Sequence, residues 1–209
     1  MNIAELWYAE TEEPWLEALD HYWRVLRPSQ VRLEQEMNSL NRECVRRLGL
    51  EEWYEFLFHK YFPWKYTAPN RLATTRKSLT RYREAGSLAE LHGIHHDLFS
   101  FDTSHIRRGL EIACRIHGLG PAGASGLLAL LFPETFATVD PFVVGALAHL
   151  EALSDRELVV VMKPEGLTIV DAEVLIGILQ RKSTENNVRF GTCDWTPRKI
   201  DMALWAFGR

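Results

Sequence analysis

A short glycine turn followed by a single aspartate is the part of this sequence best suited to chemistry. Gly118, Leu119 and Gly120 form a Gly-hydrophobic-Gly turn, and Asp140 follows Gly120 by 20 positions. Glycines permit backbone conformations and close approaches that a side chain would block. Helix N-termini offer unpaired N–H groups and a favourable dipole to a phosphate. Two helices joined by such a turn, with Leu119 packed between them, can therefore hold a phosphate backbone.

The flanking residues predict a helix on each side of this turn. Thr103 or Ser104 can cap the first helix, and Gly118 ends it. The apolar residues of that helix share one face: Ile106, Leu110, Ala113 and Ile116. The second helix is apolar and leads into the loop FPETFATVD. Asp140 followed by Pro141 is also an ordinary helix start, so a structural role is the alternative for this aspartate.

Most of the remaining chain also has apolar residues at spacings of three and four. This pattern predicts about ten helices and no sheet, so the expected fold class is all-α. The 209 residues suffice for one large domain or two small helical lobes. Outside the turn, helices are expected from Pro14 to Pro28, from Ser29 to Gly49, around Trp53, from Asn70 to Gly86, from Ser87 to Leu91, from a Ser154/Glu157 capping box through Met162, from Thr168 into RKSTENN, and from Thr196 to Phe207.

An aromatic-rich segment, FHKYFPWKYTAPNR, is predicted to be a structured loop. Pro63 and Pro69 interrupt regular structure there. Trp64 and Tyr66 could stack on a base, with Lys65 between them facing a phosphate. The alternative is that these aromatic rings simply pack against the core, as aromatics beside prolines mostly do.

A second expected loop, HGIHHDLFSFD, contains His92, His95 and His96. With Asp97 or Asp102 these are residue types that can bind a metal, but their spacing fits no known ligand pattern. We therefore expect histidines at the surface or at helix ends. The three cysteines are odd in number and far apart, which predicts free thiols and no metal held by cysteine. They are Cys44, Cys114 and Cys193.

The composition is that of an ordinary soluble globular protein, with 46% hydrophobic and 25% charged residues. No apolar run approaches the roughly 18 to 20 residues that cross a bilayer, so no membrane partner is expected. The acidic N-terminal segment MNIAELWYAETEEPW lacks the pattern of a secretory signal. A cytoplasmic protein is expected, associated with the nucleoid if it is bacterial.

The formal net charge of −4 argues against a protein whose whole surface binds nucleic acid. Any such contact must come from a local patch. The densest basic segment is the helix expected after Asn70, and its hydroxyls at Thr74, Thr75 and Ser78 could also contact phosphates. A solvated helix face is the alternative. The basic residues of this helix are Arg71, Arg76, Lys77, Arg81 and Arg83.

Residues Ile116 to Leu131 resemble the hairpin of the helix-hairpin-helix DNA glycosylase superfamily, which includes endonuclease III and the adenine and oxoguanine glycosylases. Members carry a Gly-hydrophobic-Gly turn, an apolar helix and a Gly/Pro-rich loop ending in a catalytic aspartate. The similar region covers about forty residues, from Thr103 to Leu147. The resemblance implies a two-lobed helical bundle with a cleft between the lobes. It would form one domain over residues 1–209, with hairpin, loop and aspartate within 104–147.

The resemblance also implies a reaction. Asp140 would stabilise the positively charged sugar as the base leaves and orient the attacking water. Bifunctional members carry a lysine two residues after the second glycine, where this chain has Ala122, so a monofunctional glycosylase is favoured. The residue two after the aspartate is often histidine and here is Phe142. No cofactor is expected, although the resemblance allows a monovalent cation at the hairpin.

A glycosylase turns its target nucleotide out of the stack and into a pocket. Trp64, Tyr66 and Trp195 are the aromatic residues that we expect to face the base. Arg198 and Lys199 are expected to contact DNA or, more commonly, to face solvent. The implied partner is double-stranded DNA, held largely independently of sequence. The residues expected to contact its backbone are Gly118, Leu119, Gly120, Ala122, Arg76, Lys77 and Arg107.

Two other functions fit the same sequence. One is a helix-hairpin-helix protein that binds DNA without catalysis. The other is a helical interaction protein with a coincidental hairpin, which fits the acidic isoelectric point of about 6.1 best.

Overall fold

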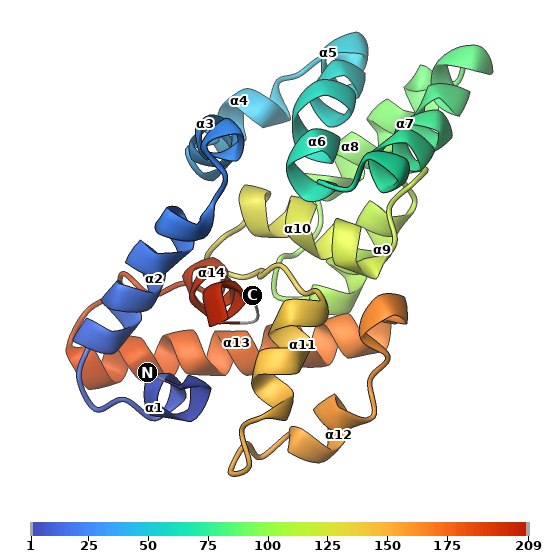
Figure 1. Cartoon of the computed structure of the whole chain (residues 1–209). Helices are drawn as coiled ribbons and strands as arrows, with labels where there is room; N and C mark the ends of the chain where they lie inside the picture. The colour runs from blue at the N-terminus through green and yellow to red at the C-terminus, as the bar shows by residue number, and fades with distance from the viewer. Residues whose placement is uncertain (1, 208–209) are drawn as a thin grey trace.

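The computed structural model describes residues 2–207, and the regular elements in that range are all helical (Figure 1). The all-α prediction is therefore confirmed. None of the described helices is both long and apolar enough to cross a membrane. The elements are α1 (Ile3–Trp7), α2 (Glu13–Val25), α3 (Pro28–Asn38), α4 (Arg42–Arg46), α5 (Leu50–Phe56), the π-helical turn η1 (Leu57–Tyr61), α6 (Phe62–Lys65), α7 (Pro69–Glu84), α8 (Leu88–Leu98), α9 (Ile106–Cys114), α10 (Pro121–Leu131), α11 (Pro141–Ala148), α12 (Arg156–Val160), the 3₁₀ turn η2 (Pro164–Gly166), α13 (Ile169–Phe190) and α14 (Pro197–Phe207).

The helices form two groups (Figure 1). One group brings the two ends of the chain together, because α2 and α13 both pack on α14, and α11 packs on α14 as well. The other group comes from the middle of the chain, where α5 packs on α8 and α9 packs on α10. Helix α13 also contacts α9 and α10, so one continuous hydrophobic core joins both groups.

Helix α10 lies at the centre of this arrangement. Each residue from Gly123 to Leu131 is buried, as expected for a helix that is apolar on all sides. Gly120 is its N-cap and Pro121 occupies its first turn. Proline is tolerated there because an N–H at that position would have no partner within the helix. The helix preceding the turn, α9, is amphipathic and packs against α10. The predicted pair of helices around the glycine turn is confirmed, but the predicted cap at Thr103 or Ser104 is wrong, because His105 is the N-cap of α9 and no side chain caps it.

Both segments that the sequence suggested to be loops are helical instead. In FHKYFPWKYTAPNR, η1 and α6 continue directly from α5, and Pro63 lies at the start of α6, directly after the π-helical turn. Helix α8 runs through HGIHHD to Leu98 and buries Ile94 and His95, which outweighs the low helix propensity of Gly93. His95 is thus a core residue, with Nε2 3.0 Å from the Val45 carbonyl oxygen.

Two helix boundaries also differ from the prediction, and one agrees closely. The single helix expected from Ser29 to Gly49 is two helices, because the Asn41 side chain caps a new start by accepting the N–H of Cys44. The expected Ser154 capping box does not form, since α12 begins after Asp155. At Thr168 the predicted cap is confirmed as a capping box with Asp171.

The glycine turn has a specific backbone requirement at one of its two glycines. Gly118 has φ +97°, and a Cβ there would lie 2.9 Å from the carbonyl oxygen of Thr75 on α7. Gly120 has φ −98°, which any residue adopts, and a Cβ there would meet no protein atom within 4 Å. Leu119 is 7% exposed and belongs to the core, as predicted. The turn is therefore closed against α7 at Gly118 and open at Gly120.

These geometries predict that one of two alanine substitutions destabilises the protein and that the other has little effect. Gly118→Ala should lower the free energy of unfolding by about 1–3 kcal/mol, because the alanine is strained at positive φ and meets the Thr75 backbone. Gly120→Ala should change it by less than about 0.5 kcal/mol. Urea unfolding followed by circular dichroism measures both. Equal stability of the two variants would contradict the assignment of the close approach to Gly118.

Candidate functional site

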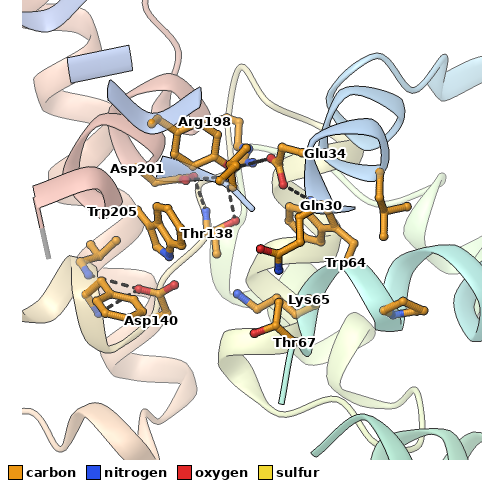
Figure 2. Close-up of a pocket in the computed structure, with 16 residues that line it drawn as sticks. Gln30, Glu34, Trp64, Lys65, Thr67, Thr138, Asp140, Arg198, Asp201 and Trp205 are labelled. Carbon is orange, nitrogen blue, oxygen red and sulfur yellow. Dashed lines mark hydrogen bonds and ion pairs between the residues drawn. The ribbon is translucent and has the colours of Figure 1, made fainter. Parts of the chain in front are cut away.

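Asp140 lies at the start of α11 and uses its two carboxylate oxygens differently. Oδ1 accepts the backbone N–H groups of Phe142 at 3.0 Å and of Val143 at 3.2 Å, so the aspartate is a helix N-cap. Oδ2 accepts no hydrogen bond from any residue that the structure describes. The side chain lines a pocket, where Figure 2 shows it beside Lys65. One oxygen thus fixes the helix while the other is available to a ligand.

The loop before Asp140 is anchored from two sides. The N–H of Thr138 donates to Asp201 Oδ2 on α14 at 2.7 Å. The N–H of Val139 donates to Ser125 Oγ on α10 at 3.0 Å. Because these two bonds fix the backbone directly before the aspartate, α10 and α14 together set the position of its carboxylate.

The pocket has a volume of about 260 Å³ and lies where the two groups of helices meet. Residues from α2, α3, α6, α11 and α14 contribute to its walls, together with the loop before Asp140. Aromatic rings line it, namely Tyr22, Trp64, Phe142 and Trp205. The same walls carry two cations and three carboxylates: Lys65, Arg198, Glu34, Asp140 and Asp201. An aromatic cavity with several convergent polar groups is typical of a site for a small planar ligand.

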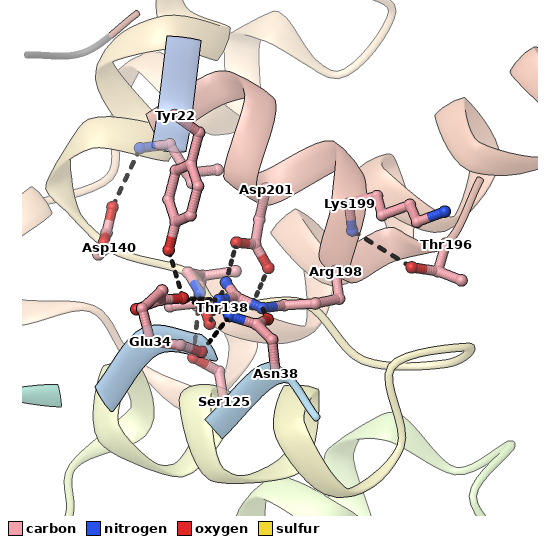
Figure 3. Close-up of polar contacts among 12 residues, drawn as sticks. Tyr22, Glu34, Asn38, Ser125, Thr138, Asp140, Thr196, Arg198, Lys199 and Asp201 are labelled. Atoms are coloured by element: carbon pink, nitrogen blue, oxygen red, sulfur yellow. Dashed lines mark hydrogen bonds and ion pairs between the residues drawn. The ribbon is translucent and has the colours of Figure 1, made fainter. Parts of the chain in front are cut away.

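A buried ion cluster forms one wall of the pocket, and Figure 3 shows its contacts. Arg198 is 6% exposed and donates to Glu34 Oε1 at 3.0 Å and to Asp201 Oδ1 at 2.5 Å. The Arg198 Nε also donates to Asn38 Oδ1 at 3.3 Å. Glu34 in turn accepts the hydroxyl of Tyr22. The cluster therefore ties α14 to α2 and α3.

Burial shifts the ionisation of this cluster. It raises the pKa of the Asp201 carboxyl to about 7, although Arg198 acts in the opposite direction. For Arg198, burial lowers the pKa, but the neighbouring Asp201, Tyr22 and Glu34 more than offset it, so the pKa lies above its usual value. Burial also raises the pKa of Tyr22 well above its usual range, so this hydroxyl remains a donor to Glu34.

Trp64 is held in the pocket wall by the same cluster. Its indole Nε1 donates to Glu34 Oε2 at 2.6 Å, and the Arg198 guanidinium carbon lies 5.4 Å from its ring centre. A ring fixed in this way presents a rigid face for stacking. Of the three aromatic residues predicted to face a base, Trp64 is the one that lines the pocket with Asp140.

The other two predicted aromatics lie elsewhere. Trp195 does not line this pocket and is buried against Trp15, with Nε1 donating to Glu12, because the segment before α14 packs on the N-terminal helices. The placement of Trp195 in a base pocket is therefore wrong. Tyr66 points to the hairpin, where its hydroxyl lies against Gly123.

The basic residues that were predicted to contact DNA lie in different environments. Arg76 turns toward Phe58, donating to its carbonyl oxygen at 3.0 Å, and Arg107 is paired with Glu173 at 2.6 Å. Neither these two nor Lys77 lines the pocket of Asp140. Arg198 is buried in the ion cluster rather than facing solvent, which corrects the expectation drawn from its place beside Lys199.

A second hollow, of about 340 Å³, lies beside the glycine turn. Gly118, Gly120 and Ala122 line it from the hairpin side, and Arg71, Thr74, Thr75 and Ser78 line it from α7. The hydroxyl-rich basic helix α7 therefore lies beside the hairpin. Arg71 makes no ion pair with any described residue. Glu165 of η2 is the other charged residue in the lining.

Several residues of the pocket were not singled out from the sequence. Glu34, Asp201 and Trp205 each stand in an ordinary amphipathic helix, where nothing local distinguishes an inward acid from a surface one. Their one available signal is spacing, since Arg198, Asp201 and Trp205 recur at intervals of three and four on one side of α14.

No group of three or more His, Cys, Asp or Glu residues within the described range could hold a metal ion. Cys44, Cys114 and Cys193 are all free thiols. A monovalent cation at the hairpin, suggested by the resemblance, stays a prediction.

Removing the central cation tests whether the ion cluster organises the pocket. Arg198→Met should lower the free energy of unfolding by about 3–5 kcal/mol, because Glu34 and Asp201 remain buried without their cation. The loss should be greater at about pH 8 than at about pH 5, since burial raises the pKa of Asp201 to about 7 and a buried carboxyl costs most when it must ionise. Lys199→Met, the adjacent control without an ion pair, should change stability by less than about 0.5 kcal/mol. Similar urea midpoints for both variants would refute this role.

No protein-family model, curated protein or solved structure compared with this chain matches it. The geometry of the two hollows is therefore the basis on which a function can be assigned.

Proposed function

We propose that this protein is a DNA glycosylase that removes a damaged or modified base by hydrolysis of the N-glycosidic bond. The observation that carries the proposal is the divided role of Asp140. One oxygen caps α11 and the other faces an aromatic pocket, while Pro141, the next residue, lines the separate hollow beside the glycine turn. The carboxylate is thereby held rigidly while keeping a lone pair for the reaction.

The chemistry follows from the position of this oxygen. As a base leaves C1′, positive charge develops on the sugar, and a fixed carboxylate beside it lowers the energy of that transition state. The same oxygen can accept a proton from the attacking water. Trp64, Trp205 and Phe142 offer faces on which a base turned out of the duplex could stack.

The hollow at the glycine turn supports the DNA-binding half of the proposal. No protein atom lies within 4 Å of where a Cβ on Gly120 would stand, at the N-terminus of α10, and Arg71 of α7 lines the same hollow. The guanidinium of Arg71 is a donor suited to phosphate oxygens and carries no information about base sequence, whereas the hydroxyls of Thr74 and Ser78 donate to carbonyl oxygens of their own helix. Binding without catalysis, through the same hollow, is the second candidate and is favoured by this surface alone.

Asp140→Asn separates the two roles of the aspartate. Asparagine caps helices about as well as aspartate, so the free energy of unfolding should stay nearly unchanged. Base release should fall by about 10²- to 10⁴-fold, because the negative charge is lost. The measurement is a panel of duplexes that each contain one modified base, treated with alkali to reveal abasic sites. No release from any duplex, or equal release by the variant, would refute the glycosylase proposal.

Salt dependence tests the hairpin surface separately from catalysis. Arg71→Gln should weaken duplex binding and reduce the slope of log K against log salt by about 1, as expected for one lost phosphate contact. Arg83→Gln is the matched control on the same helix, since Arg83 is already paired with Glu51 at 2.8 Å and Glu55 at 2.7 Å. Identical slopes for the wild type and Arg71→Gln would place the DNA elsewhere.

A further inference from the structure

A third hollow, of about 350 Å³, shares one wall with the pocket of Asp140. Arg198 is the residue common to the two linings, so the ion cluster stands between the two cavities. Helix α14 contacts both α2 and α10, whereas α2 and α3 make little contact with α10 within the described range, which leaves this hollow open. It is therefore separate from both Asp140 and the glycine turn.

The walls of this third hollow are mainly apolar. Met37 and Ala129 are fully buried and Met202 is nearly so, which places the floor of the hollow inside the protein rather than on its surface. Methionine side chains are flexible and polarisable, so they adapt to ligands of different shape. An apolar hollow of this size is typical of a site for a small molecule. The apolar residues of the lining are Leu19, Trp23, Met37, Ala129, Leu130, Pro133 and Met202.

The polar residues of the same lining include no acid. They are Asn38, Thr196, Arg198 and Lys199. The Asn38 amide donates to Glu34 at 2.5 Å and accepts the Arg198 Nε at 3.3 Å, so both side chains are already engaged in the ion cluster. Thr196 Oγ1 accepts the backbone N–H of Lys199 at 3.2 Å. The amine of Lys199 is therefore the charged group of this lining that remains available.

The Lys199 side chain is half-buried and has no partner for its charge. Its Nζ makes no hydrogen bond or ion pair with any residue that the structure describes. Figure 3 shows it extending away from the acids of the ion cluster, Glu34 and Asp201, which Arg198 neutralises. A ligand with one negative charge would supply the missing partner through a charge-assisted hydrogen bond.

We propose that the third hollow binds a small organic carboxylate, whose apolar body fills the cavity and whose negative group pairs with Lys199. An inorganic anion does not fit, because it would leave the apolar walls facing water. A nucleic-acid strand does not fit either, since its charges repeat along the chain while the lining offers one available cation. The site is independent of the proposed function, because it contains neither Asp140 nor the glycine turn.

The methionines of the chain allow the site to be located directly. The probe is 2-naphthoate, a flat apolar body with one carboxylate, and the full-length protein carries ¹³C in its methionine methyl groups. Met37 and Met202 line the hollow, whereas Met162 does not. The NMR signals of Met37 and Met202 should therefore shift on titration and that of Met162 should stay in place. No shift at Met37 and Met202 with millimolar 2-naphthoate would overturn the proposal.

A neutral probe of nearly the same shape, 2-naphthamide, tests the role of the charge. The wild type should bind 2-naphthoate about 5- to 50-fold more tightly than 2-naphthamide, as expected for one charge-assisted hydrogen bond at a half-buried site. Lys199→Met should remove this difference and leave the affinity for 2-naphthamide unchanged. Lys163→Met, which replaces an exposed lysine outside the lining, is the matched control and should keep the wild-type preference.

Equal affinity of the wild type for the two probes would show that the hollow takes apolar molecules without selecting a carboxylate, and it would overturn the proposal. An undiminished preference in Lys199→Met would do the same, because the cation would then be another residue. The comparison of the two probes on the wild type stays decisive even if the Lys199→Met variant fails to fold. Base release from modified duplexes reports on Asp140 instead, so neither result decides the other.

Discussion

The buried cation of Arg198 is the constraint on which the rest of the site depends. A guanidinium that is 6% exposed must have its charge balanced, and the chain supplies Glu34 and Asp201 at hydrogen-bonding distance. Removing either acid would leave a buried N–H group of the guanidinium without its acceptor. The planar fork of arginine donates to both carboxylates at once from fixed directions. The position of α14 relative to α3 is consequently fixed by electrostatics as well as by packing.

This constraint reaches Asp140 through one further bond. Asp201 uses Oδ1 for Arg198 and Oδ2 for the N–H of Thr138, so the ion cluster also holds the loop that ends in Asp140. Ser125 holds the next residue from the other group of helices. The aspartate therefore lies where hydrogen bonds from both groups of helices hold the same loop. A site built at such a junction is rigid without needing long elements of its own.

Much of the fold could be predicted from the sequence, because helices leave local signals. The apolar periodicity, the cap at Thr168 and the glycine turn all depend on residues within one or two turns of each other. The segment around Pro63 was misjudged since a proline in the first turn of a helix looks the same, in sequence, as one that breaks it. Asp140 as a helix cap was likewise a local property and is confirmed.

The candidate site was less predictable because its residues meet only in the tertiary structure. Glu34 and Arg198 are 164 positions apart in the chain, and each alone resembles a solvent-facing charge. Trp195 and Trp205 illustrate the same difficulty for aromatics. They stand near the same end of the chain, yet one packs against Trp15 and the other lines the pocket. Which tryptophan faces a cavity is decided by the packing of α2 on α14, and no local pattern contains that information.

The acidic net charge is compatible with a local anion-binding surface, because most exposed cations elsewhere are neutralised. Arg83, Arg107, Arg115 and Arg181 each pair with a carboxylate. On α7, by contrast, Arg71, Lys77 and Arg81 make no ion pair with any described residue. The electrostatic potential near the hairpin is set by these unpaired cations and by the N-terminus of α10, because charges beyond about 8–10 Å are screened at physiological salt. The net charge of the chain therefore does not decide where an anion can bind. The pairing of individual side chains decides it.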